Sequence, residues 1–279
     1  MRVRVILIWV IVLAVATACG PGGGRGGRVV ASFYPLAFAA QQVAGPGVRV
    51  ENLTPPGAEP HDLEVSPTDV ADIRSARLVL LLGHGFQPQL EDAAGTGDTV
   101  ERLLDTPGLD LLPNGDPHVW LDPLRFARIV VRIGAALGDR TGAARLEGRL
   151  QQLDDDFRSG LADCDHHEIV TSHEAFAYLA QRYGLEQIPI TGLSPEAEPR
   201  PADLARVVEL VRARGVTTVY FETLVSPRIA QTVARETGAK TAVLDPIEGL
   251  TPAESARGED YFTRMRANLE ALRAGLGCR

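Results

Sequence analysis

The chain has 279 residues, of which 45% are hydrophobic and 23% are charged, and its formal net charge is −8. This length is enough for one large or two ordinary globular domains. The acidic balance, with Lys240 as the single lysine, argues against nucleic acid and anionic lipid headgroups as partners.

The N-terminus is predicted to be an export signal over residues 1–18. Arg2 and Arg4 form a basic start, an apolar run follows, and small residues precede Cys19. Because the apolar run is shorter than the ~20 residues that span a bilayer, we interpret the signal as cleaved. The cysteine after small residues resembles a bacterial lipobox, which predicts lipidation of Cys19. The protein would then be exported and lipid-anchored to the outer face of the cytoplasmic membrane, although ordinary export with an incidental cysteine is the alternative.

The glycine-rich residues 19–28 are expected to form a flexible tether, because they offer nothing to bury. With Cys19 acylated, Cys164 and Cys278 remain as an even pair in an oxidising compartment. We expect a disulfide between them, with two buried free thiols as the alternative.

Beyond the tether, apolar runs typical of strands alternate with helical patterns. The expected strands are 29–32, 48–53, 78–82, 168–171, 187–190, 216–221 and 241–244. The expected helices are 66–76, 122–137, 141–162, 174–182, 201–214 and 227–238. Strands and helices that alternate in both halves predict an α/β protein with two (β/α) lobes and mostly parallel sheets.

The domain boundaries follow from the same pattern. We expect an N-terminal lobe over residues 29–121, linking helices over 122–163 and a C-terminal lobe over 164–279. The second linking helix is long and polar, so it should act as a stiff spine that joins the lobes. A helical hairpin packed on one lobe is the alternative.

Three histidines, His61, His118 and His173, each lie in a short turn marked by proline or serine after an apolar run. Neutral imidazole is a preferred zinc ligand, and three imidazoles leave one coordination position to fill. Each histidine alone is more simply explained as a hydrogen-bonded surface residue or a helix cap. Their long spacing means that only the fold could bring them together, across a cleft.

Two carboxylates also follow expected strands. Glu222 comes after the strand 216–221 and Asp245 after the strand 241–244, and His173 follows the strand 168–171. Ligands of open α/β sheets bind at the carboxyl ends of strands. Taken alone, Asp245 before a proline is a turn residue and Glu222 is a solvated loop charge, but the whole set favours a metal site.

Five segments carry a family resemblance that covers nearly the whole mature chain. They read PPGAEPHDLEVSPTD, DPHVWLDP, VTSHEAFAYLAQRYGL, YFETLVSPRIAQTVARETGAK and VLDP. In this order they resemble the metal-binding lipoproteins of ABC importers, the ZnuA and TroA group of cluster A-I. The resemblance implies two lobes joined by a rigid helix, one metal ion in the interlobe cleft, and delivery of that ion to an ABC permease with its ATPase.

The resemblance also implies a ligand set. By position, His61, His118 and His173 match the three family histidines, and Asp245 matches the carboxylate contributed by the last lobe. Glu222 could orient one of the imidazoles, as metal-bound histidines usually require. The histidine-rich loop that many zinc members carry is missing between the first two ligands. A monomer is expected.

Three imidazoles and one carboxylate suit Zn²⁺, whereas carboxylate-rich sites suit Mn²⁺. The prediction is therefore a zinc carrier in which His173 decides the metal, with Mn²⁺ or dual Zn/Mn binding as the alternative. An exported zinc hydrolase with Glu222 as general base is a competing class. A surface adhesin is a third class of function, and only the predicted extracytoplasmic location supports it. A fourth ligand at Asp245 would close the site, so we expect no enzymatic activity.

Overall fold

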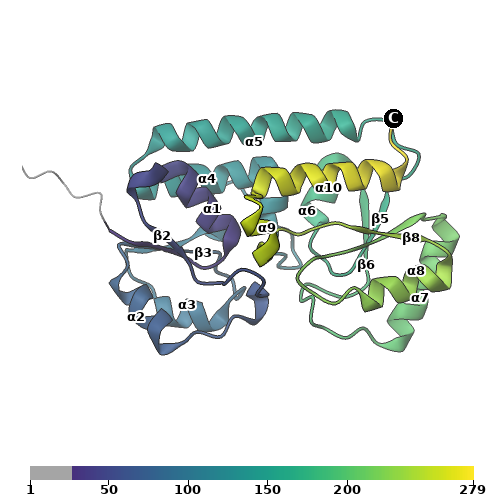
Figure 1. The fold of residues 1–279 in the computed structure, drawn as a ribbon, viewed down its shortest axis with the longest axis horizontal. Coiled ribbons are helices and arrows are strands. Elements are labelled where there is room, and N and C mark those ends of the chain that lie inside the picture. Colours follow the sequence, from purple (N-terminus) through teal and green to yellow (C-terminus); the bar gives the residue numbers. More distant parts are fainter. Residues whose placement is uncertain (1–26) are drawn as a thin grey trace, which may run out of the picture.

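The computed structural model describes residues 27–279, in which two α/β lobes lie side by side beneath a long helix (Figure 1). The predicted signal over residues 1–18, the lipidation site at Cys19 and most of the tether lie outside the described residues. Among residues 27–279, no helix combines the length and the hydropathy that crossing a membrane requires.

The N-terminal lobe is built on a parallel sheet with the strand order β2-β1-β3-β4. Its strands are β1 (Val29–Ala31), β2 (Val50–Asn52), β3 (Leu78–Leu81) and β4 (Val100–Arg102). Its helices are α1 (Tyr34–Ala44), α2 (Pro67–Ser75) and α3 (Pro88–Ala94), with short 3₁₀ turns η1 (Gly45–Gly47), η2 (Pro60–Asp62), η3 (Leu103–Asp105) and η4 (Val119–Leu121). Every residue of β3 is buried, which explains its uninterrupted apolar sequence, because helices cover both faces of a parallel sheet.

The C-terminal lobe repeats this topology, with the strand order β6-β5-β7-β8 and parallel pairing throughout. Its strands are β5 (Glu168–Thr171), β6 (Glu186–Pro189), β7 (Thr218–Phe221) and β8 (Lys240–Val243). Its helices are α6 (Ala177–Tyr183), α7 (Pro201–Arg214), α8 (Arg228–Thr237), α9 (Pro252–Ala256) and α10 (Tyr261–Leu276). The predicted fold class of two lobes with parallel sheets is confirmed.

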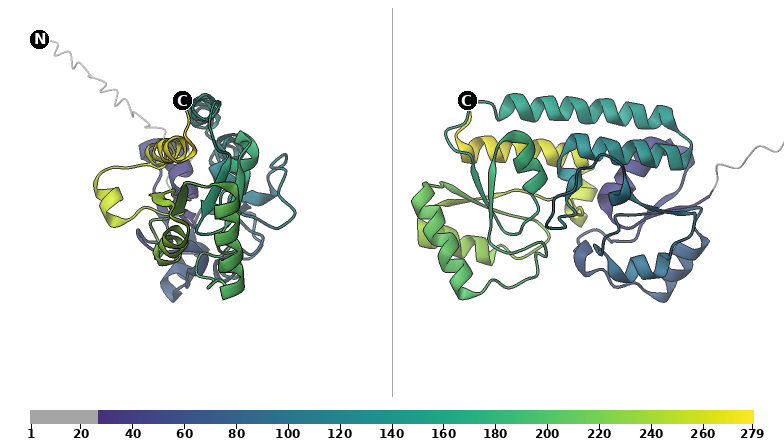
Figure 2. Two further views of the ribbon diagram at one scale, coloured as in Figure 1. Left: turned by 90° about the vertical axis from the view of Figure 1, so that its right-hand side faces the viewer. Right: turned by 180° about the vertical axis from the view of Figure 1, so that it is seen from behind.

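Two helices join the lobes. Helix α4 (Pro123–Leu137) begins at Asp122, whose carboxylate accepts the backbone N–H groups of Leu124 and Arg125. Helix α5 (Arg140–Gly160), the spine helix, runs antiparallel to α4 and extends along both lobes, where it meets α1 at one end and α10 at the other (Figures 1 and 2). Helices α4 and α5 form an antiparallel hairpin, but α5 packs against helices of both lobes, so the hairpin is not confined to one lobe as in the alternative.

The start of the spine helix lies unusually close to α1. A Cβ atom added at Gly142 would stand 2.0 Å from the carbonyl oxygen of Val43, so only glycine permits this approach. Leu146, Leu150 and Leu153 of the same helix are buried in one hydrophobic core that draws residues from both lobes. Because this core is continuous, the lobes are held as one packed body rather than as two bodies on a hinge.

The C-terminus is tied to the beginning of the second lobe. Cys164 and Cys278 form a disulfide, so the predicted pairing is confirmed over the alternative of two free thiols. The bond links the segment after the spine helix to Cys278, two residues past the end of α10. It therefore fastens the last helix beside the spine.

Candidate metal site

Four side chains from the two lobes converge at one point. Each of His61, His118, His173 and Glu248 offers a ligand atom that lies within 4.8 Å of the other three. The described part of the chain contains no other group of three or more such residues. The fold thus brings together the three histidines that the sequence singled out, and adds a glutamate that it did not.

The two histidines of the N-terminal lobe are positioned by carboxylates two residues earlier. His61 lies in η2, where Glu59 Oε1 accepts its backbone N–H at 3.1 Å. His118 immediately precedes η4, and Asp116 Oδ1 accepts its backbone N–H at 2.9 Å and contacts its ring Nδ1 at 2.6 Å. In both cases a short polar turn fixes the backbone of the histidine, and at His118 it also holds the ring.

His173 follows β5, but the helix predicted to begin at residue 174 begins only at Ala177. The backbone N–H of Glu174 donates instead to the carbonyl of Gly192, 3.0 Å away, and the Thr171 hydroxyl donates to the carbonyl of His173 at 2.8 Å. One long-range and one local hydrogen bond therefore take the place of the first turn of the predicted helix. They leave His173 in a bend that points its ring at the cluster.

The four ligand atoms have the spacing of a tetrahedral zinc shell. Glu248 Oε1 lies 3.0 Å from His118 Nε2, 3.2 Å from His61 Nε2 and 3.6 Å from His173 Nε2. The Nε2 atoms of His118 and His173 are 3.4 Å apart. Zinc bonds of ~2.0–2.1 Å in a tetrahedron place the ligand atoms roughly 3.3 Å from one another.

The hydrogen bonds on the far side of two rings fix their tautomers. His118 Nδ1 contacts Asp116, and His173 Nδ1 lies 2.8 Å from Glu222 Oε1. An ionised carboxylate only accepts hydrogen bonds, so each Nδ1 carries a proton. If both rings are neutral, the two Nε2 lone pairs face each other and Glu248, so a proton or a metal ion is needed between them.

The site is largely buried, and neighbouring carboxylates raise the pKa values of two of its histidines. His118, His173 and Glu248 are at most 1% exposed, whereas the side chain of His61 retains 11% exposure. Burial lowers the pKa of His173, but hydrogen bonds to Glu222 and Glu248 outweigh it and raise that pKa to about 10. His118 behaves alike, its pKa raised by Asp116 and Glu248 against its burial.

Two glutamates at the site have opposite protonation tendencies. Burial raises the pKa of Glu248, but hydrogen bonds from His118, His173 and His61 outweigh it and hold that pKa well below its ordinary value. Burial and the nearby charge of Glu248 raise the pKa of Glu59 to about 9. Glu248 is therefore the ionised carboxylate that faces the imidazoles.

The prediction that Asp245 is the fourth ligand is wrong. Asp245 Oδ2 lies 2.8 and 2.9 Å from Nη2 and Nε of Arg264, and its Oδ1 accepts the backbone N–H of Ile247 at 2.8 Å. Both oxygens are thus engaged away from the cluster, and Glu248 takes its place. The expectation that ligands lie at strand ends pointed to the correct loop after β8. Within that loop, however, it favoured Asp245, the first acidic residue, over Glu248.

Asp116 was also missed, although its position two residues before His118 is a recognisable signal for a side chain that folds back onto the following backbone. Glu222 lies where the sequence suggested, with one oxygen on the ring of His173. The remaining histidines are elsewhere, with His84 paired to the exposed Asp105 and His167 exposed.

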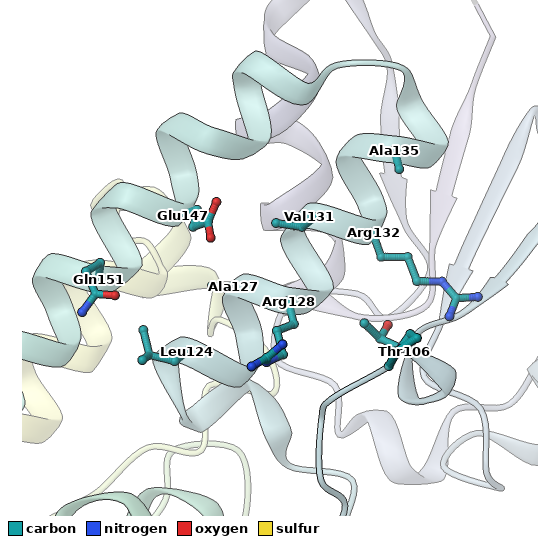
Figure 3. A pocket seen from close by; sticks show the side chains of 10 residues that line it. Thr106, Leu124, Ala127, Arg128, Val131, Arg132, Ala135, Glu147 and Gln151 are labelled. Carbon is teal, nitrogen blue, oxygen red and sulfur yellow. The ribbon is translucent and has the colours of Figure 1, made fainter.

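A groove of about 680 Å³ lies away from this site, between α4 and the spine helix (Figure 3). It is lined by side chains such as Leu124, Val131 and Glu147. None of the four clustered side chains lines it. The groove therefore has no part in the metal site.

Known proteins resemble the chain over most of its length. The family model described as "Zinc-uptake complex component A periplasmic" (ZnuA) matches residues 29–275. Zinc-binding lipoprotein AdcA of Streptococcus pneumoniae (strain R6) is 36% identical over 276 residues, covering 88% of this chain and 55% of AdcA. The chain therefore spans about half the length of the AdcA relatives that it matches.

One further protein and one solved domain of AdcA match over nearly their full lengths. The high-affinity zinc uptake system protein ZnuA of Bacillus subtilis is 33% identical, with 93% of each chain covered. The crystal structure of the Zn(II)-bound ZnuA-like domain of S. pneumoniae AdcA superposes with a TM-score of 0.77 at 37% identity, covering 90% of this chain and 99% of that domain.

Proposed function

Because the chain belongs to the ZnuA family of zinc-uptake components, we propose that it is the solute-binding component of a metal ABC importer. It captures one Zn²⁺ ion between its lobes and delivers it to the permease. The observation that carries this proposal is the convergence of His61, His118, His173 and Glu248 from both lobes.

Zinc is favoured over manganese by the donor set. Three imidazole nitrogens and a single carboxylate oxygen match the ligand preference of zinc, and intrinsic affinity also rises from Mn²⁺ towards Zn²⁺. His173 supplies the third imidazole, and Glu222 orients it. Binding of Mn²⁺, or of both metals, is the competing outcome.

The same donor set argues against a zinc hydrolase. A catalytic zinc keeps three protein ligands and leaves an open position for water. Here Glu248 supplies a fourth ligand atom, and Glu222, the candidate general base, is engaged with the His173 ring. We therefore propose a carrier site without enzymatic activity.

The cellular setting follows from the N-terminal sequence. We propose that residues 1–18 are removed on export and that lipidated Cys19 anchors the protein to the outer face of the cytoplasmic membrane. There it would act as a monomer beside a permease with its ATPase. Relatives named as lipoproteins support this arrangement.

Handover must work within a rigid body. The continuous core and the spine helix oppose a wide opening of the lobes. His61 is the ligand with solvent exposure, and it lies in the short turn η2. We propose that zinc enters and leaves on this side, by local movement of that turn when the permease docks.

Competitive titration of zinc against a chelator of known affinity tests the proposal, with protein produced without residues 1–18. We expect one zinc per chain, and a loss of at least about tenfold in affinity for His118→Ala, His173→Ala and Glu248→Ala. His167→Ala, which removes an exposed histidine, serves as the control. Unchanged stoichiometry and affinity in the three site variants would refute the site.

A further inference from the structure

The turn that presents Glu248 contains a strained residue. Ile247 has a φ of +57° and is completely buried. This left-handed conformation is strongly disfavoured for a β-branched residue. Glycine and asparagine are the residues that usually adopt it in turns. Such strain persists only where the surrounding structure enforces it, and it concentrates at functional sites.

Within the same loop, Asp245 holds Ile247 in this left-handed conformation. Its Oδ1 accepts the backbone N–H of Ile247 at 2.8 Å, while its Oδ2 is held by the guanidinium of Arg264. The side-chain amide of Asn268 makes two hydrogen bonds with the backbone of Asp245. It accepts the Asp245 N–H at 2.8 Å and donates to the Asp245 carbonyl at 2.6 Å. Arg264 and Asn268 both belong to α10, so the turn is anchored on a packed helix.

The other lobe holds the same turn from the opposite side. Trp120 Nε1 donates to the carbonyl of Pro246 at 2.7 Å, and the hydroxyl of Tyr261 donates to the carbonyl of Trp120 at 2.6 Å. Trp120 lies two residues after His118. The hydrogen bond from Trp120 therefore fixes the backbone before Glu248 relative to the segment that carries His118.

We propose that Asp245 is a positioning residue that holds the turn through Ile247 and thereby fixes the Glu248 carboxylate among the three imidazoles. This inference rests on the proposed function of the site in zinc binding. Asp245 does not touch the metal. It acts through the backbone of the two residues that separate it from Glu248.

The positioning also determines which metal the site prefers. Glu248 turns one oxygen to all three Nε2 atoms, whereas its Oε2 is buried without a hydrogen-bond partner. One carboxylate oxygen with three imidazoles makes a four-coordinate shell, which suits zinc. A loosened turn would let both oxygens bind, and the larger shell would favour Mn²⁺.

Two substitutions separate this role from simple stabilisation. Asp245→Ala removes the acceptor for the Ile247 N–H, and we expect the zinc association constant to fall about ten- to a hundredfold, with a smaller Zn²⁺/Mn²⁺ affinity ratio. Asp245→Asn keeps an oxygen for that N–H but loses the charge that Arg264 pairs with. We expect this variant to lose thermal stability while its zinc affinity stays near that of the wild type.

The matched control is Val207→Ala, which opens a cavity in the separate outer core of the C-terminal lobe. It should lower the melting temperature and leave both the affinity and the visible absorption of the Co²⁺-substituted protein unchanged. Asp245→Ala should weaken the intense absorption of tetrahedral Co²⁺. Wild-type affinity in Asp245→Ala, or equal losses in Asp245→Ala and Asp245→Asn, would overturn the inference. Absence of zinc binding in the wild type would instead refute the proposed function.

Discussion

His173 Nδ1 donates a hydrogen bond to Glu222 Oε1 at 2.8 Å, so its Nε2 faces the centre of the cluster. Glu222 lies at the end of β7 and His173 two residues past the end of the adjacent strand β5. The parallel pairing of these strands brings the carboxylate to the back of the ring. We therefore propose that Glu222, which is not among the four clustered side chains, orients the His173 ring without binding the metal.

Glu222→Gln should weaken zinc binding about ten- to a hundredfold, because the amide supports the ring less strongly than the carboxylate. Chelator competition measures this loss. Glu174→Gln is the matched control, since Glu174 adjoins His173 but contacts Asn114. Equal affinities in Glu222→Gln and the wild type would show that the ring orients itself.

Zinc binding should release protons at neutral pH. The pKa of His173 is raised to about 10 in the metal-free protein, against an ordinary value of 6.5, so its ring is protonated until zinc displaces the proton. Calorimetric zinc titrations at pH 7, in buffers with different ionisation enthalpies, should report the release of at least one proton per ion. A heat that is independent of the buffer would contradict this expectation.

The same shift predicts opposite pH trends for stability and affinity. Because the pKa of His173 is higher in the folded state, its protonation stabilises the metal-free protein fully below about pH 6.5, and this contribution is lost as pH rises towards about 10. Zinc affinity should increase over the same window. Thermal melts of metal-free protein and chelator titrations across this pH range check both trends.

Arg182 connects the spine helix to the C-terminal lobe. Its Nε lies 2.6 Å from Asp154 of the spine helix and 3.2 Å from Asp122, and both carboxylates are buried. Arg182→Met should lower the free energy of unfolding by about 3 kcal/mol, the low end for a broken buried pair, because the Arg182 side chain retains 15% exposure.

Urea unfolding of metal-free protein measures this loss. Arg214→Met is the control, because Arg214 makes its ion pairs with Glu168 and Glu186 at the surface and such pairs contribute little. Equal stability losses in the two variants would show that the Arg182 network does not fasten the lobes.

The disulfide should stabilise the fold without affecting the affinity for zinc. Cys164 and Cys278 are separated by 114 residues, and closing a loop of this length stabilises a protein by about 2–5 kcal/mol. The double variant Cys164→Ser/Cys278→Ser should unfold at lower urea concentration and keep wild-type zinc affinity. A wild-type midpoint in the double variant would contradict the account.

The sequence predicted the fold closely where local signals were strong. The helix α7 (Pro201–Arg214) and the strand β5 (Glu168–Thr171) have the predicted bounds, and the linking helix α4 (Pro123–Leu137) begins one residue later than predicted. Proline starts both helices, and an apolar run defines the strand. Helix α6 was predicted three residues too early. Its first turn is replaced by hydrogen bonds to a distant loop, which no local pattern records.

The sequence predicted the loops that form the candidate site and its three histidines, but not which carboxylate joins them. Histidine is rare enough in this chain that strand ends and turns identified the three imidazoles. Choosing between Asp245 and Glu248 required the position of Arg264 on α10, more than a dozen residues later in the sequence. The ion pair between Arg264 and Asp245 is a tertiary contact, so the local spacing of residues in the sequence does not reveal it.

X-ray diffraction from crystals of the zinc-loaded protein, recorded on both sides of the zinc absorption edge, tests the central claim most directly. We expect a single anomalous peak about 2.0–2.1 Å from the Nε2 atoms of His61, His118 and His173 and from one oxygen of Glu248, with Asp245 still paired to Arg264. A peak coordinated by Asp245, or one that lacks Glu248 and carries water in its place, would contradict the closed carrier site.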